Sequence, residues 1–251
     1  MLKKTSITNI QMLQKNAYKL WEYNEAWLEA RKALFTSSEI FKIMGVKGIG
    51  DTGLTYIYER VTESVTGKRL DSNVDNDAIR HGIMYEPEAI QKFMQINKIS
   101  EGFVRVRTFI HEPGSMFGGT PDWIHILRES IDGTAYEVRG GEAKCPPKGF
   151  VSLSQCNTAM DLRDENRSYY VQCLDQMQNL GTMEHDFVAF HPDFSGPLMP
   201  HIRIIANEPF IVKGKKTHPV NDDLKLLTAR KSEAVEIFNR VKNDLITKGY
   251  A

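Results

Sequence analysis

The stretch PDWIHILRESIDGTAYEVRGGEAKC, residues 121–145, has the pattern of two paired strands. Its two halves, 122–130 and 135–145, are predicted strands that follow 103–111, where apolar and polar residues alternate with the period of a half-buried strand. Between these segments lies Asp132-Gly133, a pair that is typical of a tight hairpin turn. The stretch therefore predicts an antiparallel hairpin within a β-sheet.

One end of this hairpin concentrates charged side chains. Side chains two residues apart in a strand point to the same face, so Glu142 and Lys144 share a face while Ala143 turns toward the core. Pro121 lacks a backbone donor and is suited to a strand entrance, which places Asp122 beside the end of the second strand. We therefore expect the carboxylates of Asp122 and Glu142 to converge.

Two carboxylates at such close range repel each other unless a cation compensates their charge. Oxygen ligands without a nearby histidine or thiolate favour Mg²⁺ or Mn²⁺. A third acid, Glu86, precedes Pro87 in a helical segment and could reach the same site through a water. Two alternatives remain at this point: a surface ion pair between Glu142 and Lys144, and a solvated helix-surface acid at Glu86.

The rest of the chain predicts an α/β fold in which helices flank a mixed central β-sheet. Further strands are predicted at 103–111, 185–191 and 200–206, and helices at 24–34, 36–45, 54–67, 75–97, 168–181 and about 221–248. Ser37 or Ser38 is expected to cap the second helix, and Pro87 to bend or restart the fourth. That fourth helix carries the apolar residues Ile79, Ile83, Ile90, Phe93 and Met94.

Length and composition indicate a single domain. The 251 residues are 41% hydrophobic and 25% charged, which is enough apolar material for one sizeable core. We expect one domain over 1–251, with a helical N-terminal part to about residue 100, a sheet core over about 101–210 and a C-terminal helix over about 220–248. The formal net charge is +0, so any site for nucleic acid must be local.

Cysteine usage and hydropathy indicate a cytoplasmic protein. Cys145, Cys156 and Cys173 are odd in number and have no C-x-x-C spacing, which excludes a four-thiolate metal site and a disulfide framework. Reduced thiols are therefore expected. No segment approaches the roughly 18 apolar residues of a membrane span, so no membrane partner is expected.

The chain resembles a known family of nucleases. Asp122 in a Pro-Asp pair, followed by Glu142-x-Lys144, resembles the PD-(D/E)xK nuclease signature. The whole is similar to the lambda exonuclease, or YqaJ-type, phage recombination nucleases, whose core is restriction-endonuclease-like. Five blocks follow the order of that family: AWLEARKALFTSSEI, HGIMYEPEAIQKF, the Pro-Asp pair, EAKCP and YYVQCLDQM.

This resemblance implies roles for the acidic residues. It implies that Asp122, Glu142 and the backbone carbonyl of Ala143 bind two divalent ions, Mg²⁺ or possible substitutes such as Mn²⁺. Glu86 would hold the metal site from the helix side, and Lys144 would orient or help deprotonate the attacking water.

The resemblance also implies a pocket for a 5′-phosphate, formed by Arg31, Ser38 and Gln172. Arg31 alone would more often form a surface salt bridge, but its spacing to Trp27 and Ser38 favours the pocket. Related nucleases often have a tyrosine four residues after this glutamine. Here that position is Gln176, so its role stays open.

The implied activity is Mg²⁺-dependent 5′-to-3′ digestion of linear double-stranded DNA, which releases mononucleotides and leaves a 3′ single strand. The resemblance further implies a homotrimeric ring, a single-strand annealing protein as partner, and a phage or prophage gene expressed in a bacterial host. The alternatives are an endonuclease of the same superfamily, for restriction or junction cutting, and a non-catalytic DNA-end-binding subunit. The basic run Lys213, Lys215 and Lys216 is either a solvated loop or a contact to the DNA backbone.

Overall fold

The structure is a computed structural model that describes residues 5–6, 25–70, 77–106, 108–111, 114–129, 135–212 and 215–250. Its centre is a mixed six-stranded sheet in the order β3-β6-β7-β8-β9, with β1 paired to β7. The strands are β1 (Thr5–Ser6), β3 (Phe103–Arg105), β6 (Trp123–Glu129), β7 (Ala135–Lys144), β8 (Glu184–Ala189) and β9 (His201–Ile205). Only β7 and β8 run parallel among these pairs. The predicted hairpin and mixed sheet are confirmed.

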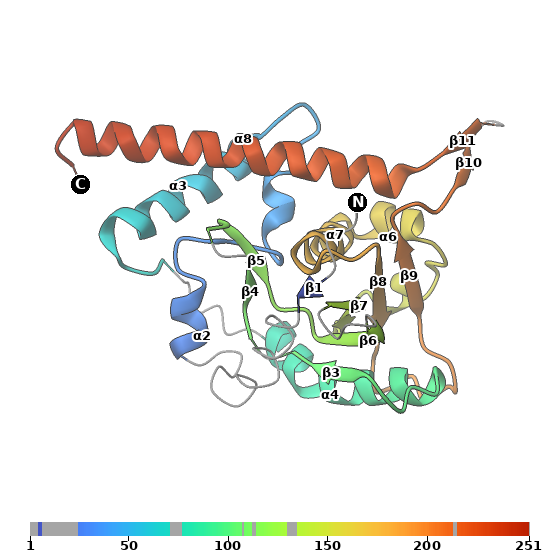
Figure 1. The fold of residues 1–251 in the computed structure, drawn as a ribbon. Helices are drawn as coiled ribbons and strands as arrows, with labels where there is room; N and C mark the ends of the chain where they lie inside the picture. Colours follow the sequence, from blue (N-terminus) through green and yellow to red (C-terminus); the bar gives the residue numbers. More distant parts are fainter. Residues whose placement is uncertain are drawn as a thin grey trace.

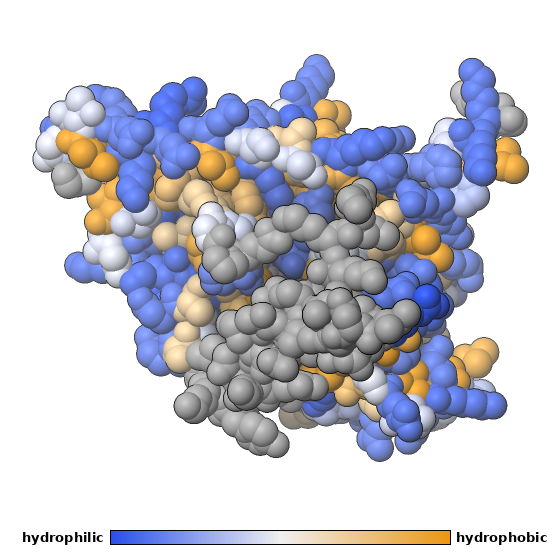
Figure 2. Space-filling model, viewed as in Figure 1, coloured by the Kyte–Doolittle hydropathy of each residue, from blue (hydrophilic) through white to orange (hydrophobic). Residues whose placement is uncertain are grey.

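Helices cover both faces of this sheet (Figure 1). On one side lie α3 (Asp51–Thr66), α7 (Arg167–Leu180) and the long α8 (Pro219–Thr247), and on the other lies α4 (Asp77–Ile96). The sheet therefore has a separate hydrophobic core on each face. Phe187 of β8 packs in the core beneath α7, and the next residue, Val188, packs in the core beside α4. Figure 2 shows hydrophilic residues along the outer side of α8 and hydrophobic ones gathered below it.

Two of the predicted helices end at the glycines that follow them in the sequence. Gly67 ends α3 with φ 67° and Gly181 ends α7 with φ 65°. Both are left-handed conformations that glycine adopts without a steric penalty. The final helix also matches its prediction closely, since α8 buries Leu227, Ala234 and Phe238 on one face.

A second, three-stranded sheet was not predicted. It has the order β2-β5-β4, formed by Phe35–Thr36, Phe117–Gly119 and Ile110–His111. The segment 103–111 is therefore not one strand, because β3 belongs to the central sheet and β4 to the second one. Phe35 pairs with Phe117, and their rings stack with centroids 5.1 Å apart. This long-range pairing replaces the start of the helix predicted at 36–45.

Only the 3-10 helix η1, Ile40–Ile43, forms there, and its N-cap Glu39 makes no side-chain cap bond. The prediction of a cap at Ser37 or Ser38 is wrong. The first helix is also shorter than predicted, since α2 spans Glu25–Ala30 and Ala33 has φ 58°.

Within α4, the helix continues through Pro87 without a restart. Ile90 is buried, whereas Ile79 and Ile83 are 39% and 47% exposed. These two residues line a cavity, as do Gly82 and Glu86 of the same half of α4.

Several short elements complete the fold. They are α5 (Phe150–Leu153), α6 (Ala159–Glu165), β10 (Phe210–Val212) and β11 (Lys215–Thr217). Thr158 and Asp161 form a capping box at the start of α6, a signal that sequence inspection could have found. Lys215 and Lys216 are exposed in β11, whereas Lys213 and the predicted Asp132-Gly133 turn lie outside the described residues.

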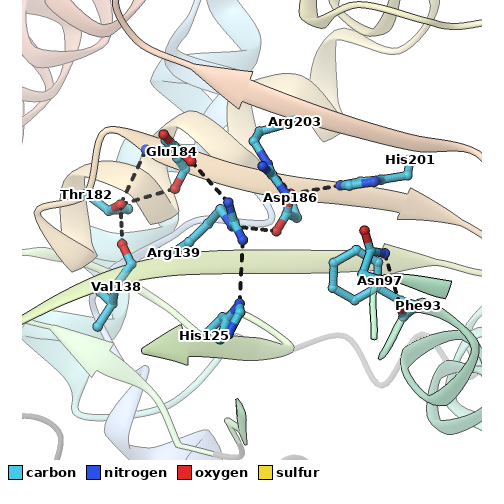
Figure 3. Close-up of polar contacts among 10 residues, drawn as sticks. All are labelled: Phe93, Asn97, His125, Val138, Arg139, Thr182, Glu184, Asp186, His201 and Arg203. Atoms are coloured by element: carbon cyan, nitrogen blue, oxygen red, sulfur yellow. Dashed lines mark hydrogen bonds and ion pairs between the residues drawn. The ribbon is translucent and has the colours of Figure 1, made fainter. Parts of the chain in front are cut away.

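A polar network ties β7, β8 and β9 together on the α4 side (Figure 3). The buried carboxylate of Asp186 lies 2.7 Å from Arg139 Nε, 3.1 Å from Arg203 Nε and 2.8 Å from His201 Nε2. Burial alone would raise the pKa of Asp186, but the His201 hydrogen bond and the two guanidinium charges outweigh it and lower the pKa.

None of the helices in the described ranges is long and apolar enough to cross a membrane.

Candidate active site

The β6–β7 pairing brings the two predicted carboxylates together. Trp123 pairs with Gly141, and one step further the Asp122 N–H donates to the Gly141 carbonyl over 2.9 Å. Asp122 therefore lies beside Glu142, and their residues are only 7% and 3% exposed. Gly141 has to be small, because a Cβ there would lie 1.8 Å from the Trp123 indole.

Asp122 also fixes the backbone of β7. Its Oδ2 accepts the Ala143 N–H over 2.6 Å. Backbone groups of residues two apart in a strand point to the same neighbour, so the Ala143 carbonyl faces the Asp122 edge, as the Gly141 carbonyl does. The Ala143 methyl group packs in the core beside α4. The predicted opposition of Ala143 to Glu142 is confirmed, and the carbonyl is available to the same site.

Three donors surround the Glu142 carboxylate. Lys144 Nζ and Gln172 Nε2 each lie 2.6 Å from Oε1, and Gln176 Nε2 lies 2.7 Å from Oε2. A surface ion pair is excluded by the burial of Glu142. The role left open for Gln176 is also answered, because its amide holds the second carboxylate oxygen.

Lys144 is a strongly held cation in this arrangement. Burial alone would lower its pKa, but the charges of Glu142 and Asp122 outweigh burial and raise the pKa above its usual value. The ammonium is therefore protonated at neutral pH beside the two acids, and its Nζ also lies 5.2 Å from the centre of the Tyr169 ring.

All predicted site residues line one cavity of about 710 Å³, whose wall includes Arg31, Ser38, Glu86, Asp122, Glu142, Ala143, Lys144 and Gln172. Within it, Glu86 is paired with Arg105, whose Nη2 lies 2.7 Å from Oε1, so it is not a simple solvated acid. Among the described residues no three histidine, cysteine or acidic side chains are grouped closely enough to bind one metal ion. The structure thus places two of the three acids side by side and Glu86 in the lining of the same cavity.

Also in the lining of this cavity, Arg31 lies over the Trp27 ring, with its Cζ 4.0 Å from the ring centre. Trp27 is in turn fixed by a 3.1 Å hydrogen bond from Nε1 to Thr120 Oγ1. Ser38 lies in the adjoining wall. Gln172 is engaged by Glu142, so its contact to a phosphate stays a prediction.

A buried ion pair behind this wall was missed by sequence reasoning. Asp175 is fully buried, and its Oδ1 lies 2.5 Å from Lys231 Nζ in α8. Its Oδ2 accepts hydrogen bonds from Ser37 Oγ over 2.5 Å and from Asn179 Nδ2 over 2.9 Å. These contacts fix the strand that leads to Ser38. No local signal pairs Lys231 with Asp175, because they lie on different helices.

Two histidines near the acidic blocks have structural contacts. His81 Nδ1 lies 2.7 Å from the Cys145 carbonyl, and His125 Nδ1 lies 3.5 Å from Arg139 Nη2. Burial lowers the pKa of His125, and the nearby Arg139 charge adds to this effect.

The sequence model of the YqaJ-like viral recombinase domain matches residues 26–182, well over half of the chain. The chain belongs to this family. The matched range contains every predicted site residue, and the YqaJ-like resemblance inferred from the sequence is confirmed.

Solved structures show the same fold at low sequence identity. An alkaline exonuclease from Laribacter hongkongensis is 18% identical with a TM-score of 0.59, over 89% of this chain and 99% of that chain. Its complex with dAMP gives 19% identity and a TM-score of 0.60 over the same shares. A phage related exonuclease from Haemophilus somnus 129PT is 14% identical with a TM-score of 0.55, over 84% and 96% of the two chains. No curated protein matches the sequence.

The YqaJ-like site has the donor chemistry of a divalent metal site. Two buried carboxylates and one backbone carbonyl face the same edge of the sheet. Oxygen donors of this kind suit Mg²⁺ or Mn²⁺ and do not suit softer metals. The Lys144 ammonium offsets the charge of Glu142, and the two glutamine amides donate hydrogen bonds to its oxygens. Asp122, Glu142 and Ala143 therefore fit the predicted ligand set.

Proposed function

We propose that this protein is a Mg²⁺-dependent exonuclease that digests linear double-stranded DNA from its 5′ ends. The observation that supports this proposal most strongly is the buried pair Asp122 and Glu142 beside Lys144, in one cavity with Arg31. Burying two acids is unfavourable unless cations compensate them. The pair therefore suits a site that binds metal ions and phosphate in turn.

Asp122, Glu142 and the Ala143 carbonyl would hold the metal ions, two per site, and Glu86 would support them from α4, directly or through a water. When bound, Mg²⁺ or Mn²⁺ would supply charge stabilisation for the phosphate and a more acidic water. Gln172 and Gln176 hold one oxygen of Glu142 each. These amides keep the carboxylate in one orientation, which preorganises the ligand.

Lys144 acts as a cation in this proposal. Because its pKa is raised by the two acids, the side chain holds its proton and can donate hydrogen bonds to a water or a phosphate oxygen. It thereby orients the attacking water and offsets the charge of the phosphate.

The 5′ polarity rests on Arg31 and Ser38. Stacking on Trp27 fixes the plane of the Arg31 guanidinium, and a planar guanidinium can bind a phosphate through two parallel hydrogen bonds. Ser38 adds a hydroxyl in the same cavity. A terminal phosphate bound there would place the nearest phosphodiester toward the acids.

The family supports a proposal for the biological setting. A YqaJ-like viral recombinase domain and structural similarity to proteins described as exonucleases support a role in phage-type recombination. We propose a homotrimeric ring in the bacterial cytoplasm that releases mononucleotides, leaves a 3′ single strand and passes it to a single-strand annealing protein.

A gel assay with Mg²⁺ tests the proposal. Linear duplex with 5′-phosphate ends should shorten to mononucleotides, duplex with 5′-hydroxyl ends should react more slowly, and closed circles should stay intact. Lys144→Ala should abolish cutting, whereas Lys225→Ala, at an exposed lysine of α8, should not. Opening of circles would instead favour an endonuclease, and binding without hydrolysis would favour an end-binding subunit.

Arg31→Ala separates the phosphate pocket from the chemistry. It should slow digestion of phosphorylated ends to the rate of hydroxyl ends, because it removes the proposed phosphate contact and leaves the acids in place. Equal loss on both kinds of end would contradict the assignment of Arg31.

A further inference from the structure

A second cavity of about 730 Å³ lies next to the candidate active site. It is enclosed by α5, the segment that follows α5, and the loop between β8 and β9. The Phe190 N–H, in its lining, donates to the Lys144 carbonyl over 2.9 Å. The ends of β7 and β8 therefore form a wall that the two cavities share.

A line of rings connects the two cavities. His81 contacts the Cys145 carbonyl, one residue beyond Lys144, and its ring centroid lies 5.4 Å from that of His191. His191 lies 5.5 Å from Phe194, which lies 4.6 Å from Phe150. The last three rings line the second cavity. A line of ring contacts thus runs from beside Cys145, which lines the first cavity, to the rings that line the second.

This surface is open and bears polar groups. Phe194 is 48% exposed and Leu198 is 79% exposed, so apolar side chains of this cavity are open to solvent. Lys92, with its Nζ 2.8 Å from the Gly196 carbonyl, holds the loop and adds a positive charge. Asn157 adds an amide that can donate and accept hydrogen bonds. Asp193 also lines the cavity, and its exposed carboxylate lies 3.9 Å from His191 Nδ1.

We infer that the second cavity binds unpaired nucleotides of a DNA strand. Aromatic side chains that stack on bases, together with a nearby cation and groups that bind base edges, are the features of single-strand sites. The choice of a DNA strand as the ligand rests on the proposed nuclease function. An enzyme that removes one strand of a duplex leaves the other strand unpaired beside its active site, where this cavity lies. A purely apolar protein segment would fit less well among Lys92, Asn157 and the histidines.

Fluorescence anisotropy with a labelled single-stranded oligodeoxynucleotide tests the inference, using the full protein in EDTA so that no strand is cut. Phe194→Ala should weaken binding about 5- to 100-fold, the usual loss for one stacked base. Tyr58→Ala is the matched control, because Tyr58 is also 48% exposed but lies on α3 away from both cavities. Lys92→Met should reduce the salt dependence of binding by about one phosphate contact.

The outcomes are distinct from those of the nuclease assay. Lys144→Ala should still bind the oligonucleotide, so a protein that binds through Phe194 but cuts nothing would refute the proposed function and leave this inference standing. Wild-type protein that does not bind the oligonucleotide would overturn the inference. So would equal binding by wild type, Phe194→Ala and Lys92→Met; a change in the oligomeric state of Phe194→Ala would then assign the cavity to contact between copies of the chain.

Discussion

Lys231→Met should destabilise the protein more than Asp175→Asn, although both break the same ion pair. Lys231→Met leaves the Asp175 carboxylate fully buried with two neutral donors, Ser37 and Asn179. Loss of one partner from a buried pair costs about 3–5 kcal/mol. Since 1 kcal/mol shifts the melting temperature of a chain of this size by about 2–4 °C, the melting temperature should fall by about 6–20 °C.

Asp175→Asn should cost less, about 1–3 kcal/mol, because its amide oxygen still accepts the hydrogen bond of Ser37. The Lys231 side chain is 12% exposed, and its flexible stem lets the ammonium turn toward water. The double variant Asp175→Asn with Lys231→Met removes both charges and leaves no unpaired ion. It should therefore be more stable than Lys231→Met alone, by about 1–3 kcal/mol.

Urea and thermal unfolding of the four proteins at pH 7.5 measure this cycle. The same proteins should be compared on duplex with phosphate and hydroxyl ends, because Asp175 positions Ser37 in the wall next to Ser38. Lys231→Met should reduce the preference for phosphate ends, since it leaves an uncompensated negative charge behind that wall. The reasoning would be refuted if the double variant were less stable than Lys231→Met, because the cost would then come from packing and not from charge.

Three further predictions concern stability and the acids. Burial lowers the pKa of His185 to about 4. Below about pH 6.5 the unfolded chain therefore binds a proton at His185 that the folded protein does not bind. The free energy of unfolding should be unaffected by this group above pH 6.5 and should fall by about 3 kcal/mol toward pH 4. Urea unfolding in EDTA across this range should show that slope, and His185→Leu should lack it. Gly141→Ala should cost about 3 kcal/mol or more, because its Cβ would overlap the Trp123 indole; an unchanged melting temperature would contradict the β6–β7 packing described above. Gln176→Leu should slow cutting about 10-fold or more with the preference for phosphate ends unchanged, as it frees Glu142 Oε2, whereas the exposed Gln155→Leu should have no effect in the same gel assay.

Local patterns in the sequence were sufficient for the hairpin and for much of the site. Strand alternation places Glu142 and Lys144 on one face, and the antiparallel pairing places Asp122 beside them. Each of these relations depends on the period of a strand and on a short connection, which neighbouring residues determine. The helix ends at Gly67 and Gly181 are equally local.

Relations between distant segments were not predictable in this way. The helical pattern of 36–45 gave way to β2 and η1 because Phe35 and Phe117, far apart in sequence, pair and stack. A local propensity is a weak preference that burial against a distant partner can reverse. The second sheet and the wall around Ser38 follow from that pairing.

By itself, the sequence determined the kind of chemistry: two converging acids, a neighbouring lysine and an ordered set of YqaJ-like blocks. Only the tertiary structure decided how each of them is held. It assigned Gln176 to Glu142 and Lys231 to Asp175, and it joined the lining of the second cavity to the end of β7 through Phe190 and Lys144. The physical reason is that periodicity specifies the face on which a side chain lies, whereas the partner it meets there is specified by the packing of whole helices and strands.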